Sequence, residues 1–273
     1  MIYVVTAVHN RENITKAFVE QLNKQINKDN ICFLMIDDGC TDNTVSVVKS
    51  IMDKSIIISG NGSLWWGGAL HEAYKWIKDH AKKEDFVMFA NDDTYFSEDY
   101  ISRAIELLCD KSKVLLAGYG ISIQSGAMMD GAVLFSPADT SFSIRVGEGN
   151  CASTRSLFCK ASDVIAIGGF HPHLLPHYWS DYEWTIRACY KKNYKVICDS
   201  NIAYYMNEES TGDNDCSIIN RNQVFSKRSV ANPWYKIIFI ILATPKRYKI
   251  KALFKQINKY IHIRKTIMEI LRR

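Results

Sequence analysis

Apolar and polar positions follow two alternating periods along the first 120 residues of the chain. Four short runs are continuously apolar, which predicts strands buried on both faces of a sheet, at 2–8, 31–36, 55–59 and 86–90. Apolar residues at helical spacing separate these runs and predict helices over 13–25, 41–52, 67–82 and 97–108. Strands that alternate with helices indicate βαβ units and a parallel sheet.

The second half of the chain has a different pattern. A fifth strand begins at 114–116, and strand-like pieces at 132–135 and 142–146 predict antiparallel strands within 121–160. A helix is expected over 179–191, followed by a strand at 194–198. We therefore predict an α/β fold with a Rossmann-like, mostly parallel sheet, flanking helices and a small antiparallel portion.

The charge divides the chain into two parts. Residues 221–273 contain 14 Lys and Arg and one acidic residue, Glu269, a net charge of +13, whereas residues 1–220 carry −8 within the overall +5. We expect a catalytic domain over 1–220 and a basic C-terminal extension over 221–273. A basic segment of this kind is typical of proteins that bind membrane lipid or nucleic acid, although it can also be a solvated helix that keeps a protein soluble.

The extension has an amphipathic pattern. An apolar segment covers 233–245, and after it apolar residues recur at near-helical spacing among lysines: Ile250, Leu253, Phe254, Ile257, Ile261, Met268 and Leu271. This pattern predicts a basic helix that lies in a membrane interface. The alternative is that the apolar stripe packs on the catalytic domain while the lysines face water.

The sequence predicts neither export nor a membrane-spanning helix. The N-terminus enters an apolar strand without a basic region or a cleavage site, and the longest apolar run, 237–243, is shorter than the ~20 residues of a spanning helix. The eight cysteines include no C-x-x-C pair, so we expect reduced, structural thiols. A cytoplasmic compartment follows as the expectation.

Acidic pairs follow two of the predicted strands. Asp37 and Asp38 come after the second strand, and Asp92 and Asp93 after the fourth. Ligands of open α/β sheets bind beyond the carboxyl ends of the strands, so both pairs are expected at one crevice. Adjacent carboxylates repel each other, and a hard divalent cation bound with ligand phosphates relieves the repulsion. Each pair alone could be a helix cap or turn; together they favour a metal–nucleotide site.

A glycine-rich loop with two tryptophans, GNGSLWWGGA, covers residues 60–69. Glycines at a helix start let backbone N–H groups approach a phosphate. The phosphate-loop motif with its lysine is absent, as is G-x-G-x-x-G after the first strand, which disfavours P-loop chemistry and dinucleotide oxidoreduction. Trp65 and Trp66 are either core anchors or, in one case, the wall of a sugar pocket.

Five segments in order resemble glycosyltransferase family 2. They are TAVHNR at 6–11, DDGCTD at 37–42, NDD at 91–93, GGF at 168–170, and SDYEWTIR at 180–187. The resemblance covers roughly residues 2–205, and the loop at 60–69 is similar to a bacterial rhamnosyltransferase-like branch that builds surface polysaccharides. It implies a GT-A fold, a nucleotide-sugar donor, a divalent metal (Mn²⁺ or Mg²⁺) and inversion at the anomeric carbon.

The resemblance also implies roles for single residues. Asp181 would be the general base, and Asp93 would bind the metal. Asp38 would bind the base of the nucleotide, beside His9, and Asp92 would lie near the ribose and the metal. The remaining nucleotide-binding candidates are Ala7, Arg11 and Gly62. Candidates for the sugar or acceptor pocket are Trp65, Trp66, His177, Trp179 and Glu183, which is also the fallback base.

The chain departs from the family pattern at several positions. Gly68 stands where a basic residue often follows the glycine-rich loop, and His71, Lys75 or Arg155 could supply that charge. The acidic residues usual after GGF and before the base are His171 and Ser180. Neither departure removes a catalytic group. We expect the N-terminus of the helix at 181–191 to keep Asp181 ionised through the helix dipole.

Two other classes of function stay open at this point. A nucleotidyltransferase that makes nucleotide sugars would need a basic glycine-rich loop after the first strand, where this chain has His9-Asn10-Arg11. A non-catalytic nucleotide-sugar-binding subunit would not need Asp181. The favoured prediction is transfer from a UDP- or dTDP-sugar to a lipid-linked or oligosaccharide acceptor at the inner face of the cell membrane, with the tail on anionic lipid. Nucleic-acid binding would rest on the tail alone and is not expected.

Overall fold

The structure is a computed structural model that describes residues 1–208, 229 and 232–270, with side chains described up to residue 258. Its centre is a ten-stranded sheet whose main path is β10-β13-β6-β12-β4-β1-β2-β3. The parallel part contains β1 (Ile2–Val8), β2 (Ile31–Asp37), β3 (Ser55–Ser59) and β4 (Phe86–Ala90), together with the pair β6 (Val114–Ser122) and β13 (Lys195–Met206). The predicted mostly parallel α/β fold is confirmed.

One antiparallel strand joins the two parallel parts. β12 (Ser156–Lys160) lies between β4 and β6 and is antiparallel to both. The remaining short strands of this sheet are β5 (Thr94–Phe96), β7 (Met128–Asp130) and β10 (Gly147–Gly149). β12 brings the residues just before it, 153–155, to the edge of the sheet where β4 ends. This position matters for the site described below.

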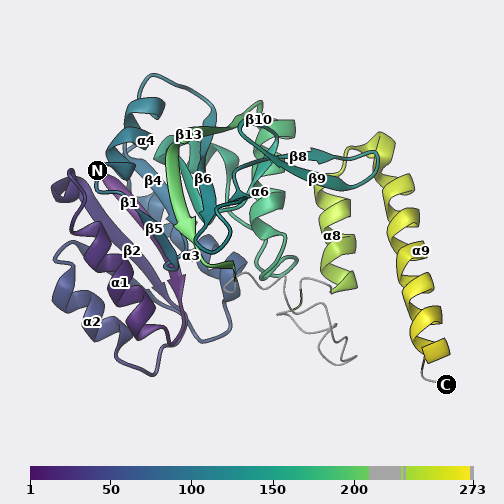
Figure 1. The fold of residues 1–273 in the computed structure, drawn as a ribbon, viewed down its shortest axis with the longest axis horizontal. Coiled ribbons are helices and arrows are strands. Elements are labelled where there is room, and N and C mark those ends of the chain that lie inside the picture. Colours follow the sequence, from purple (N-terminus) through teal and green to yellow (C-terminus); the bar gives the residue numbers. More distant parts are fainter. Residues whose placement is uncertain (209–228, 230–231, 271–273) are drawn as a thin grey trace.

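Helices cover both faces of the sheet (Figure 1). Helices α1 (Glu12–Leu22) and α4 (Tyr100–Leu108) bury their apolar faces in one core, to which α2 (Thr44–Ile51) also contributes. Helices α3 (Trp65–His80), α5 (Ala161–Ile167) and α6 (Ser180–Lys192) form the core on the opposite face. A 3-10 turn, η1 (Lys28–Asn30), precedes β2. α2 begins at residue 44 rather than 41 because Asp42 Oδ1 accepts the N–H of Thr44 at 3.1 Å, which turns the chain before the helix.

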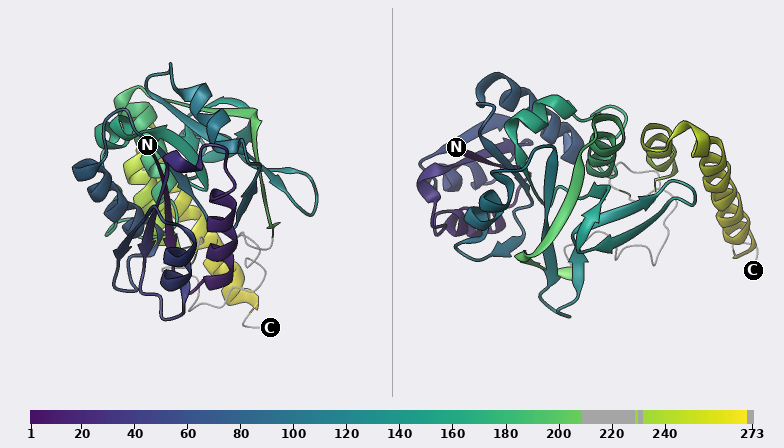
Figure 2. Two further views of the ribbon diagram at one scale, coloured as in Figure 1. Left: turned by 90° about the vertical axis from the view of Figure 1, so that its left-hand side faces the viewer. Right: turned by 90° about the horizontal axis from the view of Figure 1, so that it is seen from above.

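A third core joins the C-terminal helices to the domain. The small sheet of β8 (Ala132–Ser136), β9 (Ser141–Arg145) and β11 (Cys151–Ala152) packs with α6 against α8 (Pro233–Ala243) and the first turns of α9 (Lys246–Ile270). The Nζ atom of Lys255 also donates to the carbonyl oxygen of Asp139 at the β8–β9 turn, 2.7 Å away. Figure 1 and the right-hand view of Figure 2 show α9 at the edge of the molecule, away from β1–β3. The extension therefore packs on the domain through one side only.

No helix in the described part of the chain is long and apolar enough to cross a membrane.

Candidate active site

The two acidic pairs lie at one edge of the sheet, as the parallel order predicts. Val8 at the end of β1 is paired with Asp37 on β2, and Val5, earlier in β1, is paired with Phe89 near the end of β4. The carboxyl ends of the three strands therefore meet at the same edge. The half-buried Ala7 lies in β1 just before this edge, and the exposed His9 follows it.

Asp38 joins the acidic turn to the start of α3. Its two carboxylate oxygens accept the backbone N–H groups of Leu64 at 3.1 Å and Trp65 at 3.0 Å. His9 Nδ1 lies 2.7 Å from the carbonyl oxygen of Asp38. The carboxylate thus holds the first turn of α3, where a negative charge is favoured by the helix dipole. The predicted contact of Asp38 with the nucleotide base remains a prediction.

The glycine-rich loop packs closely on the acidic turn. Gly39 and Gly62 have φ of +75° and +78°, and a Cβ on Gly39 would lie 2.9 Å from the backbone nitrogen of Gly62. The N–H of Gly60 donates to the carbonyl oxygen of Asp37 at 2.6 Å. These contacts fix the loop at the carboxyl end of β2. The role of Gly62 in nucleotide binding remains a prediction.

Arg11 bridges the second acidic pair. Its guanidinium lies 2.8 Å from Asp92 Oδ1 and 3.2 Å from Asp93 Oδ2. Asp92 is buried, and its other oxygen accepts the hydroxyl of Thr15 at 2.8 Å. Burial raises the pKa of Asp92, and the charge of Arg11 opposes that rise. Arg11 is therefore held at the site by its ion pairs with Asp92 and Asp93.

Asp93 is suited to a cation. Its Oδ1 is buried and has no hydrogen-bond partner among the described residues, and an unsatisfied buried carboxylate oxygen is costly unless a cation or donor reaches it. No group of three or more His, Cys, Asp and Glu side chains gathers in the described chain to bind a metal. A divalent ion here would need ligands from the donor diphosphate and water, which is the usual arrangement for Mg²⁺ with phosphates.

Asp181 lies in the first turn of α6. Trp179 precedes that helix in the left-handed conformation, with φ of 70°. The Asp181 carboxylate accepts the backbone N–H of Tyr182 at 2.8 Å and that of Thr154 at 3.4 Å. Burial raises its pKa to about 6, and Asp130 adds to the rise. The desolvation of the carboxylate outweighs the backbone N–H groups, which lower the pKa, and a group with a pKa of about 6 is still ionised at neutral pH. The contribution of the helix dipole stays a prediction.

The predicted aromatic pocket residues have different surroundings. Trp65 and His177 face each other with ring centroids 5.7 Å apart. The indole N–H of Trp66 donates to the hydroxyl of Thr154 at 2.9 Å, and Trp66 packs on the core under α3. Trp179 contacts Phe239 of α8 at 5.1 Å between centroids. Trp66 is thus held as an anchor, whereas Trp65 and His177 lie together beside the loop.

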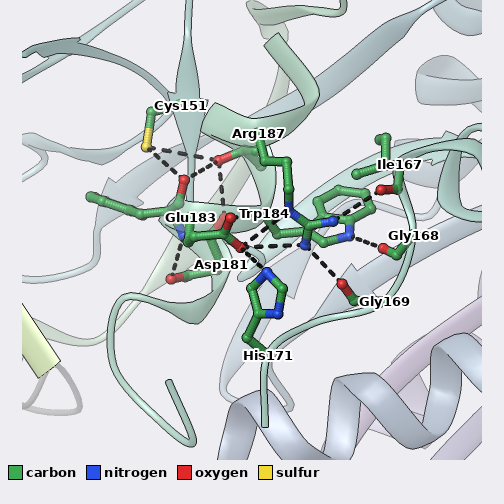
Figure 3. Close-up of polar contacts among 11 residues, drawn as sticks. Cys151, Ile167, Gly168, Gly169, His171, Asp181, Glu183, Trp184 and Arg187 are labelled. Atoms are coloured by element: carbon green, nitrogen blue, oxygen red, sulfur yellow. Dashed lines mark hydrogen bonds and ion pairs between the residues drawn. The ribbon is translucent and has the colours of Figure 1, made fainter. Parts of the chain in front are cut away.

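Glu183 is enclosed in a cluster that positions α6 (Figure 3). It is 1% exposed, and its carboxylate contacts Arg187 Nε at 3.0 Å and His171 Nε2 at 3.7 Å. Arg187 also donates to the carbonyl oxygens of Ile167 at 2.9 Å and Gly169 at 2.7 Å. The contacts connect the Gly168-Gly169-Phe170 turn to α6, so Glu183 has a positioning role here. Its predicted place in the pocket and its role as fallback base remain predictions. The i,i+4 spacing of Glu183 and Arg187 was visible in the sequence.

A buried carboxylate that the sequence analysis missed lies close to Asp181. Asp130, at the end of β7, accepts the hydroxyls of Ser153 at 2.5 Å and Tyr204 at 2.6 Å. Its charge is one of the influences that raise the pKa of Asp181. Asp130 lies in no recognisable motif, and only the return of β12 beside β4 and β6 brings Ser153 to it. The sequence contains no signal for this contact.

The fold agrees with the comparison of the sequence with known protein families. The sequence model of glycosyl transferase family 2 matches residues 3–160. The chain belongs to this family. No curated protein has a significantly similar sequence.

Solved glycosyltransferases have the same fold at low sequence identity. Mannosyltransferase PcManGT from Pyrobaculum calidifontis, in complex with GDP-Man and Mn²⁺, is 14% identical with a TM-score of 0.58, over 88% of this chain and 61% of that one. Staphylococcus aureus TarS is 18% identical with a TM-score of 0.60, over 92% and 50% of the two chains. A TarS fragment, residues 1–349, in complex with UDP-GlcNAc is 14% identical with a TM-score of 0.62, over 96% of this chain and 72% of that one. The chain thus spans about half to three fifths of the first two proteins, and the likeness confirms the GT-A fold.

Proposed function

We propose that the chain is an inverting glycosyltransferase that moves a sugar from a nucleoside-diphosphate donor to an acceptor hydroxyl. One observation supports this most strongly. The N–H of Asn91 donates to the carbonyl oxygen of Arg155 at 2.9 Å, and the N–H of the neighbouring Thr154 donates to Asp181. Two consecutive residues thus connect the predicted metal motif, Asn91-Asp92-Asp93, to the predicted base, which supports a shared site for the metal and the acceptor.

The proposed reaction is a single displacement. The acceptor oxygen attacks the anomeric carbon and gives its proton to the Asp181 carboxylate, while the bond from that carbon to the phosphate oxygen breaks and its electron pair leaves with the diphosphate. Attack from the face opposite the leaving group inverts the carbon. A pKa of about 6 is favourable for this task, since a base with a pKa near the working pH is both ionised and basic enough to accept the proton.

We propose that Asp93 binds a divalent cation, Mn²⁺ or Mg²⁺, with the donor diphosphate. Such an ion supplies Lewis-acid stabilisation of the charge that grows on the leaving group. Arg11 holds both carboxylates in place in the structure. Two of the similar proteins have Mn²⁺ in their complexes, the mannosyltransferase and GalNAc-T7 with UDP and GalNAc.

The acceptor and the membrane are the finer part of the proposal. The exposed side of α9 combines three large apolar side chains, Ile250, Phe254 and Ile257, at 70%, 64% and 43% exposure. The exposed cations Lys246, Arg247, Lys251 and Lys255 accompany them, with no acidic residue among positions 246–258. A helix face of this composition fits the interface of an anionic membrane. We propose a lipid-linked or oligosaccharide acceptor at the cytoplasmic face, in bacterial O-antigen or capsule synthesis of the rhamnosyltransferase-like kind.

A vesicle assay tests the membrane part. Sedimentation with phosphatidylglycerol–phosphatidylcholine vesicles should recover the full chain, and Ile250→Glu with Phe254→Glu should reduce recovery at least about tenfold, because two exposed apolar contacts are lost. Ile144→Glu on β9, also exposed, is the matched control. Equal recovery of all three proteins would contradict membrane docking through α9.

A thermal-shift screen tests the donor and metal parts. UDP-, dTDP- and GDP-sugars are added with MnCl₂, with MgCl₂ or with EDTA, because a ligand that binds the folded state raises the melting temperature. We expect a shift for a UDP- or dTDP-sugar that depends on the metal and weakens in Asp93→Asn. A shift of the same size in EDTA would contradict the metal role, and no shift with any nucleotide sugar would contradict the proposed function.

A further inference from the structure

The crevice has few positive groups for an anionic donor. The proposed site contains six carboxylates: Asp37 and Asp38 after β2, Asp92 and Asp93 after β4, and Asp130 and Asp181, which bond to the neighbouring Ser153 and Thr154. Arg11 is already paired with two of them. A nucleoside diphosphate brings further negative charge, which grows as the sugar leaves. A second cation near the metal motif would therefore be expected from electrostatics alone.

Arg155 has the required position. Its carbonyl oxygen accepts the N–H of Asn91 at 2.9 Å, so its backbone lies directly beside the first residue of the metal motif. Its Nη1 lies 3.7 Å from the sulfur of Met206, and Met206 is paired in the sheet with Thr94, the residue after Asp93. The side chain thus extends along the 91–94 turn.

Arg155 also has unused hydrogen-bonding capacity. The methionine sulfur is a weak acceptor, and within the described chain no carboxylate forms an ion pair with this guanidinium. A guanidinium carries five N–H donors in a planar arrangement that matches two phosphate oxygens. Arg155 is only half-buried, so these donors remain accessible.

The other basic side chains considered for this charge are placed less well. Lys75 lies in the middle of α3 and is paired with Glu72 at 2.5 Å. Burial lowers the pKa of His71, and its ring packs beside Gly169, so it is a neutral side chain at ordinary pH. Arg155 is thus the better-placed candidate for the second cation.

We infer that Arg155 binds the diphosphate of the donor with its guanidinium and stabilises the charge that this group gains as it leaves. The inference rests on the proposed function and adds a residue to it. When the bond between the anomeric carbon and the phosphate oxygen breaks, the electron pair goes to the terminal phosphate, and the bidentate hydrogen bonds of Arg155 strengthen with that charge. No proton moves to or from Arg155.

Binding of UDP and UMP separates this role from a structural one. Isothermal titration with the full chain in MgCl₂ compares wild type, Arg155→Gln, Arg155→Lys and the matched control Arg145→Gln, an exposed arginine on β9. We expect Arg155→Gln to weaken UDP binding about 10- to 100-fold and UMP binding less than about threefold, since charge-assisted bonds to the second phosphate are lost. Arg155→Lys should restore part of the UDP affinity, and Arg145→Gln should bind as wild type. dTDP with dTMP, and GDP with GMP, serve in the same way if the wild type prefers those nucleotides.

The outcomes are distinguishable from those of the proposed function. Wild-type UDP affinity in Arg155→Gln, or an equal loss for UDP and UMP, would overturn the role of Arg155 while leaving glycosyl transfer intact. If Arg155→Gln does not fold, the folded Arg155→Lys variant decides, because a point charge should lose the bidentate contact and bind UDP several-fold more weakly than wild type; unchanged affinity would overturn the inference. A wild-type chain that binds none of the three diphosphates would overturn the proposed function, and the inference with it.

Discussion

The indole N–H of Trp66 donates a hydrogen bond to the hydroxyl of Thr154 at 2.9 Å. Trp66 lies in the glycine-rich loop at 60–69, where the first turn of α3 begins, and Thr154 contacts the carboxylate of Asp181 through its backbone. The bond therefore joins the loop that would face the donor to the residue that would accept the proton. Thr154 thus connects the anchor Trp66 to Asp181, the proposed base.

Removal of this bond should lower stability and disturb the site. Trp66→Phe keeps an aromatic ring but leaves the buried Thr154 hydroxyl without its donor, and we expect a loss of about 1–3 kcal/mol in the free energy of unfolding. Urea denaturation measures it. Trp66→Phe combined with Thr154→Val should lose less than the sum of the two single changes, because both remove the same bond. Additive losses would show that the bond contributes nothing.

The adjacent glycines Gly67 and Gly68 of α3 form a matched pair of positions for substitution by alanine. A Cβ on Gly67 would lie 2.4 Å from the carbonyl oxygen of Leu175, whereas the nearest atom to a Cβ on Gly68 would be Leu64 Cβ, 3.3 Å away. Gly67→Ala should therefore lower the unfolding free energy by about 1–3 kcal/mol through overpacking. Gly68→Ala should be neutral or stabilising, because alanine favours the helix by about 1 kcal/mol. Thermal unfolding of both variants checks this, and equal melting temperatures would contradict the close approach.

The rate of transfer should depend on pH through Asp181. The group acts as a base only when ionised, and burial raises its pKa to about 6. The rate should therefore be level above that pH and fall about tenfold for each unit below it, as the carboxylate becomes protonated. Single-turnover rates between pH 4.5 and 8 measure the profile. A rate unchanged down to pH 4.5 would exclude a base with this raised pKa.

The C-terminal helices should be needed for stability. Phe239 of α8 is fully buried against Phe135 and Trp179, with ring centroids 5.7 and 5.1 Å away. Phe239→Ala should reduce the unfolding free energy by about 3–5 kcal/mol. Trp234→Ala, at a 63% exposed position of the same helix, should change it by less than about 0.5 kcal/mol. If both variants unfold alike, α8 does not share the core of the domain.

Periodicity and strand ends predicted the parallel sheet and the place of Asp38 and Asp93 at one edge of it, because both are consequences of local pattern and parallel order. The tertiary surroundings of single side chains were less predictable. Nothing local indicates that Asp130 lies near Asp181, since β12 brings their surroundings together. The burial that raises the pKa of Asp181 likewise depends on the packed fold.

The surroundings of the basic C-terminal extension were likewise only partly predictable from the sequence. Its amphipathic pattern left two possibilities, membrane contact and packing on the domain. The structure shows that α9 buries Ala252 against the domain and exposes Ile250 and Phe254. A single stripe in the sequence thus separates into two faces, because apolar residues at successive positions point in different directions around a helix.

The central claim is that this glycosyltransferase uses Asp181 as its base, and Asp181→Asn tests it most directly. The measurement is the release of nucleoside diphosphate from the preferred nucleotide sugar and acceptor, with donor affinity measured beside it. The account predicts a rate at least about 100-fold below wild type, with donor affinity within about threefold and a folded variant, since a buried charge is removed. A wild-type rate of release in Asp181→Asn would contradict it.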